Sequence, residues 1–331
     1  MTSHLFIRDL AQIVFAITFL MALTGCLETV PSPMLEQALS APEPPSAEER
    51  AQDTEPIPPD AIPIASINQL QQIGDHPDYP LDGHYVLTQD IDASATADWN
   101  EGKGFEPIGA RGWGELEDGG FTGRFNGRGH VIRALTINRP EEDAVGLFGG
   151  PGNNSVIQNV GLEDCHIEGN NMTGSLAGLS SATVSMCYAT GVVQGGSSVG
   201  GLIGSNNTEV SDSYASCTVS GADTVGGLVG MNSNLVSRCF STGAVADGDF
   251  NTHGLVGDSP ASGGEAGIVE DSFWDVETSG QDATHSGATG LTTAEMQMRS
   301  TFTEAGWDFD EVWGIDEGED YPYLRWELDL E

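Results

Sequence analysis

Residue patterns that could perform chemistry are few in this chain. Gly196-Ser197-Ser198-Val199-Gly200 matches the G-x-S-x-G pattern that presents a nucleophilic serine between a strand and a helix. No helix is expected after it, and Ala222-Asp223-Thr224-Val225-Gly226 takes the same place one repeat later, so we interpret the pattern as a turn. None of the seven histidines belongs to an H-E-x-x-H motif, and the cysteines and histidines lack zinc spacing. The sequence predicts no catalytic residue, no metal site and no cofactor.

Acidic residues offer two weaker candidates. Asp90 and Asp92 lie two positions apart at the end of a predicted strand, where carboxylates could bind Ca²⁺. Because a loop glycine and further ligands are missing, we favour a structural contact for this pair. Asp247, Asp249 and His253 lie in a longer segment between two repeats, which is the one place where an acid-base site could be built.

A repeat must position any such residue. A Gly-Leu signature occurs five times, in steps of 29, 26, 26 and 27 residues, which is typical of stacked coils. The copies begin at Gly146-Leu147, Ser175-Leu176, Gly201-Leu202, Gly227-Leu228 and Gly254-Leu255.

A second motif keeps the same period. Its valines are Val184, Val210, Val236 and Val269, with steps of 26, 26 and 33 residues, so the last coil carries an insertion between Phe240 and Val269. Two motifs in phase predict that each repeat is one coil of a solenoid.

The composition of the repeat predicts short strands. Val, Thr, Ser and Gly dominate, and helix formers are sparse. Alternation along the Gly-Leu strand places Leu202 on one face and both Val199 and Ile203 on the other. In the second motif, alternation would put Asp212 and Arg238 beside apolar residues, so we expect a bend or bulge there. Stacking should align leucines with leucines and aromatic rings with aromatic rings.

These motifs resemble the GLUG repeat of bacterial and archaeal surface proteins and adhesins. The resemblance rests on Val225-Gly226-Gly227-Leu228-Val229-Gly230 and on Cys187-Tyr188-Ala189-Thr190-Gly191, with matching flanks at Tyr85 to Asp92 and Tyr321 to Trp326. It covers about residues 63 to 331 and implies an all-β, right-handed parallel β-helix on a cell surface. The metallopeptidases of that family are not matched in their catalytic part.

The chain divides into five predicted segments. They are a lipoprotein signal peptide (1–25), a lipidated cysteine with a disordered acidic Pro-rich tether (26–62), an N-terminal cap (63–120), the repeats (121–275) and a C-terminal cap (276–331). Ser66 is expected to cap a short helix, and Thr292 to begin a capping box with Glu295. We expect the aromatic residues of the tail, Trp307 to Trp326, to plug the last coil.

The first residues predict the location. An apolar run from Ala11 to Leu23 precedes Thr24-Gly25-Cys26, which resembles a lipobox in which Cys26 is lipidated. The alternative is a short transmembrane anchor with an incidental cysteine. Both interpretations place most of the chain outside the cytoplasm, attached to a membrane and exposed at the outer membrane or cell surface.

Charge restricts the partners. The net charge is −39, and Lys103 is the only lysine, which excludes nucleic acid and anionic membranes as partners. An acidic, lysine-poor surface indicates a salty habitat; a dedicated cation-binding role is the alternative.

The remaining cysteines are expected to be free, buried thiols. Cys187 and Cys239 lie two coils apart, roughly 9.6 Å, which exceeds disulfide reach. Ser213 and Ser272 take the same place in other coils, which indicates a slot for a small side chain. Cys165 and Cys217 are not expected at matching positions. The sequons at Asn153, Asn171 and Asn206 are interpreted as turn residues.

Two functions fit these observations. The first, which we prefer, is a non-enzymatic surface lipoprotein that serves in adhesion, ligand binding or surface architecture, with a glycan or a protein on another cell as partner. The second is a β-helix polysaccharide lyase or glycoside hydrolase that uses paired carboxylates in a groove.

Overall fold

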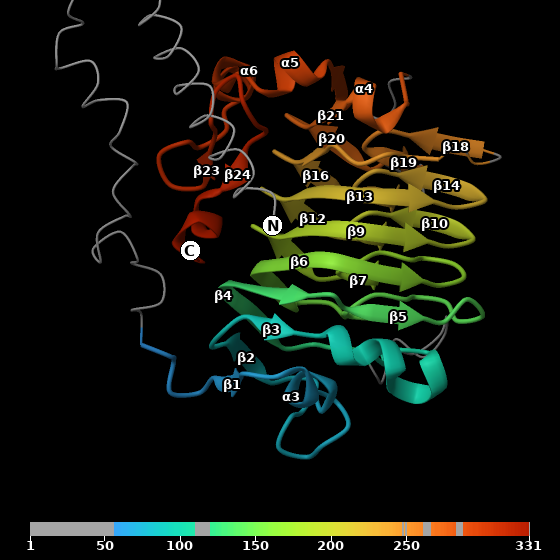
Figure 1. The fold of residues 1–331 in the computed structure, drawn as a ribbon, viewed down its shortest axis with the longest axis vertical. Helices are drawn as coiled ribbons and strands as arrows, with labels where there is room; N and C mark the ends of the chain where they lie inside the picture. The colour runs from blue at the N-terminus through green and yellow to red at the C-terminus, as the bar shows by residue number, and fades with distance from the viewer. Residues whose placement is uncertain are drawn as a thin grey trace, which may run out of the picture. The chain divides into compact units, whose positions relative to one another are not determined.

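Parallel strands stacked coil upon coil make up the structure (Figure 1). The computed structural model describes residues 56–109, 120–246, 248, 250–260, 266–282 and 287–330. These residues form a β-solenoid of about 7 turns with strands about 26 residues apart. The predicted all-β parallel solenoid is confirmed.

Each regular coil consists of four short strands joined by tight corners. The first such coil contains β10 (Ser197–Gly200), β11 (Ile203–Asn206), β12 (Glu209–Ser211) and β13 (Tyr214–Ser220). The next contains β14 (Asp223–Gly226), β15 (Val229–Asn232), β16 (Leu235–Ser237) and β17 (Phe240–Ser241). The third contains β18 (Phe250–His253), β19 (Val256–Asp258), β20 (Ile268–Glu270) and β21 (Phe273–Asp275). Equivalent residues pair in register, as Val210 does with Val236 and Val236 with Val269.

The earlier coils use longer strands that bend around a corner. They contain β4 (Arg124–Arg133), β5 (Thr136–Asn138), β6 (Val156–Glu168), β7 (Ala177–Ser180), β8 (Thr183–Ser185) and β9 (Tyr188–Gln194). Before them come β1 (Ile62–Ile64), α3 (Ile67–Gln71), β2 (His84–Leu87), β3 (Ile91–Asp92) and the 3-10 segment η1 (Ser94–Gly102).

The N-terminal segment is part of the stack as well as its cover. β1 pairs in parallel with β2, and β2 and β3 both pair in parallel with β4. Parallel coils therefore begin inside the region 63–120 that we predicted as a cap. The predicted helix is present: the Ser66 hydroxyl accepts from the Gln69 N–H and caps α3.

After the last coil, β22 (Thr289–Leu291) adds a parallel strand to β21. The chain continues through α4 (Val276–Ser279), α5 (Thr293–Met296), α6 (Arg299–Glu304), β23 (Trp313–Gly314), β24 (Tyr323–Leu324) and η2 (Arg325–Leu330). The predicted capping box between Thr292 and Glu295 begins α5. In Figure 1 these helices lie beside the end of the stack, whereas β23, β24 and η2 lie along its side.

Glycines allow the coils to approach each other at one corner. A Cβ on Gly201 would lie 2.3 Å from the carbonyl oxygen of Gly227, and one on Gly227 would lie 2.0 Å from that of Gly254. A side chain at these positions would overlap the next coil, so the spacing of the stack requires glycine there.

The predicted alternation along the Gly-Leu segment is wrong. β10 ends at Gly200 and β11 begins at Ile203, so Leu202 lies at a corner rather than inside one strand. Val199, Leu202 and Ile203 are all fully buried in the core. Because the chain changes direction at the corner, side chains on both sides of it can point inward.

The predicted bend in the second motif is confirmed. Asp212 and Arg238 have φ of 48° and 50°, and Met186 and Asp271 have φ of 52° and 48° at the same corner of other coils. The left-handed backbone turns the chain at this corner. In one coil it does so at Asp212, so that both Val210 before it and Ser213 after it are buried. The small slot is occupied by Cys187, Ser213, Cys239 and Ser272, all buried.

The last coil carries its insertion between Phe240 and Val269, as predicted, but the candidate residue His253 does not lie in the extra length. Phe250 to His253 form β18, which pairs in register with β14, so this stretch is an ordinary strand of the coil. The extra length lies mainly between β19, which ends at Asp258, and β20, which begins at Ile268. In the preceding coil the same connection spans only residues 233 and 234.

Candidate functional site: the tail-covered face of the solenoid

A ladder of aromatic rings runs up the outside of the stack. Tyr188, Tyr214 and Phe240 stack in consecutive coils, with ring centroids 4.9 and 4.8 Å apart and planes within 3° and 8° of parallel. Phe273 continues the column because it pairs with Phe240. The ring-on-ring stacking that we predicted is confirmed, but the rings point outward because the residue before each one fills the small inward slot.

The C-terminal tail covers this ladder. Trp326 lies 5.4 Å from Tyr188, and Trp313 lies 5.9 Å from Phe240, measured between ring centroids. Trp307 lies 6.0 Å from Phe273. These rings form a cluster separate from the solenoid core. The tail aromatics therefore cover a lateral face, and the prediction that they plug the last coil is wrong, because they pack on the outward-facing rings of several coils.

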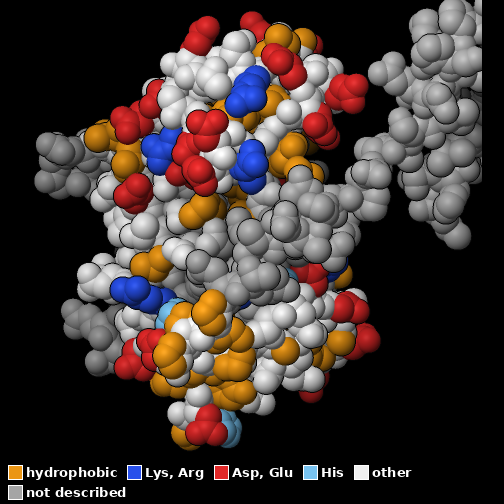
Figure 2. All heavy atoms as spheres, turned by 90° about the vertical axis from the view of Figure 1, so that its left-hand side faces the viewer, with side chains coloured by type: hydrophobic (Ala, Val, Ile, Leu, Met, Phe, Trp, Pro, Cys, Tyr) orange, Lys and Arg blue, Asp and Glu red, His pale blue; other side chains and the backbone are white. Residues whose placement is uncertain are grey.

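The outer side of this tail is charged. Figure 2 shows the face that carries it, where acidic and basic side chains are mixed in the upper part and hydrophobic side chains gather lower down, over the first strands. Glu311 and Arg325 of the tail are exposed, in contrast to Trp326, which is 3% exposed. The tail thus presents a polar surface in place of the aromatic one that it buries.

Two carboxylates hold the tips of the ladder tyrosines. The Tyr188 hydroxyl donates to Glu163 Oε1 over 2.6 Å, and Glu163 also pairs with Arg133. The Tyr214 hydroxyl donates to Glu327 Oε2 over 2.8 Å, while Glu327 Oε1 accepts from the Leu324 N–H.

Burial dominates the electrostatics of these groups. It raises the pKa of Glu327 to about 7, although the hydrogen bonds from Tyr214 and Leu324 favour the charged form. Burial, followed by the charge of Glu327, also raises the pKa of Tyr188 and that of Tyr214 well above the usual value. A carboxyl group that titrates near neutral pH therefore lies between tail and ladder.

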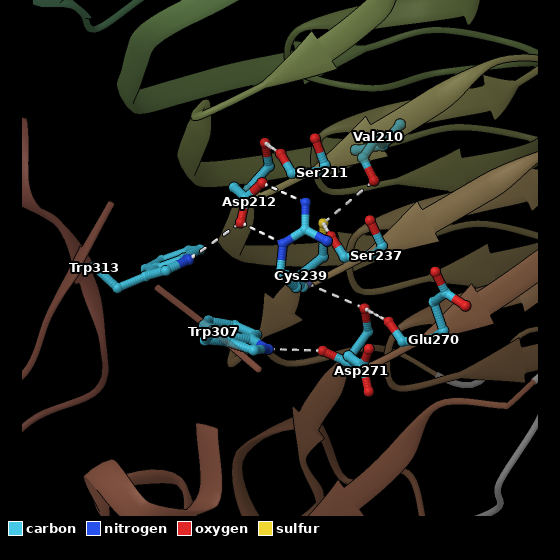
Figure 3. A network of polar contacts seen from close by, with 12 residues as sticks. Val210, Ser211, Asp212, Ser237, Cys239, Glu270, Asp271, Trp307 and Trp313 are labelled. Atoms are coloured by element: carbon cyan, nitrogen blue, oxygen red, sulfur yellow. Dashed lines mark hydrogen bonds and ion pairs between the residues drawn. The ribbon is translucent and has the colours of Figure 1, made fainter. Parts of the chain in front are cut away.

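An ion pair links consecutive coils under the tail (Figure 3). Arg238 donates to Asp212 through Nε and Nη2, both over 2.8 Å, from equivalent positions one coil apart. The Trp313 indole N–H lies 3.4 Å from Asp212 Oδ1, and the Trp307 indole N–H donates to the Asp271 carbonyl over 2.8 Å. The hydrogen bonds that Arg238 donates to Asp212 raise the pKa of Arg238, although burial opposes this rise. These charges attach the tail to the corner of the coils.

Asp275 attaches the capping helices in the same way. It is fully buried, and its Oδ1 accepts from the N–H groups of Glu277 and Thr278 at the start of α4. Its Oδ2 accepts from the hydroxyls of Thr293 and Tyr321 over 2.6 and 2.7 Å. Burial opposes the charge on Asp275, but these four donors outweigh it and lower the pKa. Sequence reasoning missed Asp275, although an aspartate directly before a helix is a signal for capping.

The acid-base site that we considered for the alternative function is not assembled by the described residues. Asp247 and Asp249 lie outside them. His253 Nδ1 contacts the Gly257 carbonyl over 2.8 Å, which holds the corner between β18 and β19.

The other sequence candidates have structural contacts. Ser197 pairs with Asp223 and Gly200 with Gly226, so the G-x-S-x-G segment lies within the repeat, as predicted, but it forms strand β10 rather than the turn that we expected. Asp90 accepts from the Val131 N–H over 3.0 Å and lies 3.3 Å from the Arg133 guanidinium. Asp92 accepts from the Ser94 N–H at the start of η1.

The repeat signature residues lie at the inner corner of each coil. Leu147, Leu202, Leu228 and Leu255 are at most 1% exposed, and the glycines before them, Gly146, Gly201, Gly227 and Gly254, are in close contact with the next coil or with Trp274. The signature therefore serves packing. Cys26, the predicted lipidation site, lies outside the described residues.

The cysteines correct one prediction. β6 pairs Cys165 with Gly191, and β13 pairs Cys217 with the same glycine, so the two cysteines do occupy matching positions two coils apart. The two cysteines lie 52 residues apart, twice the 26-residue interval, so the repeat period alone would have shown the match. Cys165, Cys187, Cys217 and Cys239 are all buried free thiols. Burial raises the pKa of Cys187 and of Cys217 to about 12.

The described part of the chain offers neither a cluster of metal ligands nor a helix that could span a membrane. No group of three or more His, Cys, Asp or Glu side chains there has the arrangement to hold a metal ion. None of the helices described is long and apolar enough to cross a membrane.

Comparison with known proteins supports the class of fold. The covered, regular stack defines a β-solenoid protein, and no protein-family model matches the chain. A candidate immunoglobulin A1 protease from Bacteroides ovatus has a similar structure, with a TM-score of 0.54 and 15% identity over 80% of this chain and 92% of that one. At this identity the likeness shows the fold alone.

Two relatives match parts of the sequence. Halomucin from Haloquadratum walsbyi is 42% identical over 132 residues, which are 39% of this chain and 1% of halomucin. A protein from Evansella cellulosilytica, described as a candidate Gly-rich membrane protein, is 51% identical over 78 residues, which are 24% of this chain and 9% of that protein. The chain therefore spans only a small part of the relatives that it matches.

Proposed function

We propose that this protein is a lipid-anchored β-solenoid of the cell surface that binds a ligand or builds surface architecture and performs no catalysis. The observation that carries the proposal is how the fold uses carboxylates that are buried or partly buried. Asp212 holds two coils together, Asp275 holds the capping helices, and Glu327 holds the tail. These three groups stabilise the fold. The repeated coils then provide an extended scaffold on which a ligand or partner can bind.

The location is supported by sequence and relatives. The apolar run before Cys26 predicts a lipoprotein signal, and the relatives are named a halomucin and a Gly-rich membrane protein. The net charge of −39 with a single lysine, together with a relative from Haloquadratum walsbyi, supports a salty environment. In this proposal the solenoid stands on a membrane by its lipid and meets a glycan or a protein on another surface.

Metabolic labelling tests the anchor. Cells that express the protein are grown with radioactive fatty acid, and the label is followed through membrane fractions. We expect label in the wild type and in a Cys165→Ala control, and none in Cys26→Ala, which should leave the membrane fraction. Equal labelling of Cys26→Ala would contradict the anchor.

Incubation with polysaccharides tests the absence of catalysis. The purified protein is incubated in high salt with a glycan panel, and the glycans are followed by mass spectrometry. We expect glycans of unchanged length, some of them retained on the protein. New smaller products that disappear in Asp247→Ala/Asp249→Ala, but persist in an Asp258→Ala control, would show a lyase or hydrolase instead.

A further inference from the structure

In Figure 1, α3 lies at the N-terminal end of the stack. Residues of α3, of η1 and of the segment after η1 line an open hollow. Its volume is about 560 Å³, which is in the range of small-molecule sites. One aromatic ring, amide groups and two carboxylates form its wall: Trp99, Asn68, Gln71, Gln72, Asn100, Asp75 and Glu106. It is remote in sequence from the covered aromatic ladder.

The frame of the hollow is fixed by hydrogen bonds. The Gln71 side chain donates to the Glu106 carbonyl over 3.0 Å and accepts from the Glu106 N–H over 2.9 Å, so it joins α3 to the segment after η1. Asn100 Nδ2 donates to the Gly104 carbonyl over 2.8 Å. Both walls are thus held in place before any ligand arrives, which lowers the entropic cost of binding.

The backbone at Trp99 is unusual. Asn100 and Glu101, which follow it, have φ of 52° and 61° and interrupt η1. Two consecutive non-glycine residues in the left-handed region carry a strain cost, and such strain is common at binding sites. The consequence is that Trp99 lies at a kink, stacked on Phe105 with ring centroids 6.4 Å apart, while it still lines the hollow.

The polar groups of the hollow are available to a ligand. No described residue accepts a hydrogen bond from the Trp99 indole N–H, whereas the indoles of Trp274 and Trp307 both donate to backbone carbonyls. Asn68 and Gln72 are exposed, and their amides make no hydrogen bond with the described residues. Amides can donate and accept at once, which suits hydroxyl groups that do the same.

We propose that this hollow binds an uncharged hexopyranose unit of a glycan. A pyranose has an apolar C–H face that packs on an indole and a rim of hydroxyls that bond to amides and carboxylates. Asp75 and Glu106, on a chain of net charge −39, disfavour uronic acids and sulfated sugars. This inference rests on the proposed function and names the ligand class and its site.

Binding of neutral and anionic glycans in high salt tests the assignment. Dextran, mannan and chitin oligosaccharides are compared with alginate and hyaluronate by isothermal titration calorimetry on the full protein. We expect Trp99→Ala to raise the Kd for a neutral glycan about tenfold and Trp99→Phe to restore part of the affinity. Phe250→Ala is the matched control, because Phe250 is an aromatic residue 70% exposed on β18.

A second variant leaves the packing of Trp99 on Phe105 unchanged, so it separates loss of binding from loss of local structure. Asn68→Ala/Gln72→Ala changes only exposed side chains of the hollow and should also weaken binding. Unchanged affinity for neutral glycans in this variant and in Trp99→Ala would overturn the site, while glycan binding itself would stand. Preference for alginate or hyaluronate would overturn the ligand class. Failure of every glycan to bind would overturn this inference together with the glycan partner of the proposed function.

Discussion

Glu327 should make the stability of the protein depend on pH in a direction that the structure determines. Its carboxyl group lies between the tail and the ladder, bonded to Tyr214 and to the Leu324 N–H. Burial raises its pKa from the ordinary 4.5 to about 7, so between these values the folded state binds more protons than the unfolded state. The free energy of unfolding should therefore fall as pH rises through this window and level off above about pH 7.

The magnitude follows from the two pKa values. Their difference corresponds to about 3 kcal/mol, which is fully present below pH 4.5 and lost above pH 7. Glu327→Gln keeps the shape and an acceptor but cannot ionise. The free energy of unfolding of this variant, relative to wild type, should rise by about 3 kcal/mol between about pH 4 and pH 8.

Urea unfolding followed by tryptophan fluorescence measures this difference. Trp313 and Trp326 lie against the ladder, so their emission should report release of the tail. Glu311→Gln, which changes an exposed carboxylate of the same tail, is the control and should keep a constant difference from wild type. A constant difference between Glu327→Gln and wild type over the whole pH range would refute the argument.

Three further predictions concern the stack. Gly201→Ala should lower the free energy of unfolding by about 3 kcal/mol or more, because its Cβ would lie 2.3 Å from a carbonyl of the next coil; an unchanged urea midpoint would contradict the packing. Asp212→Asn should lower the free energy of unfolding by about 1 kcal/mol, because it weakens the bidentate contact with Arg238. Adding Arg238→Lys should restore little of this stability. Full additivity of the two changes in a double-mutant cycle would contradict their coupling. The four described cysteines should resist maleimide at about pH 8 in the folded protein and react after denaturation, because burial raises each thiol pKa; rapid labelling of the native protein would show that the coils open.

The repeat itself could be predicted because its cause is local. The neighbouring coil excludes a side chain at Gly201 or Gly227, and Val210 and Val236 lie in the core. Equivalent positions of each coil therefore require the same type of residue. This requirement appears in the sequence as a repeat of fixed period. The left-handed corner at Asp212 was predictable for the same reason, since alternation alone would have placed a charged residue beside apolar ones.

The candidate site was only partly predictable. The tail aromatics were recognised as a cover, but their position was not, because a sequence that is rich in tryptophan does not tell which apolar surface it meets. Asp275 and Glu327 were missed, since nothing near them in sequence shows that the hydroxyls of Tyr321 and Tyr214 approach them. The match between Cys165 and Cys217 was predictable but missed, because the two cysteines lie 52 residues apart, twice the 26-residue interval.

By itself, the sequence determined the stacked parallel coils, their interval, the small inward slot and the two capped helices at Ser66 and Thr292, because each depends on neighbours that repeat or lie within one turn. Only the tertiary structure decided which face of the stack the tail covers, that the carboxyl group of Glu327 becomes buried there, and that Trp99 lines a hollow beside α3. Those features depend on contacts between segments far apart in the chain, where packing and desolvation, rather than local pattern, select the partner.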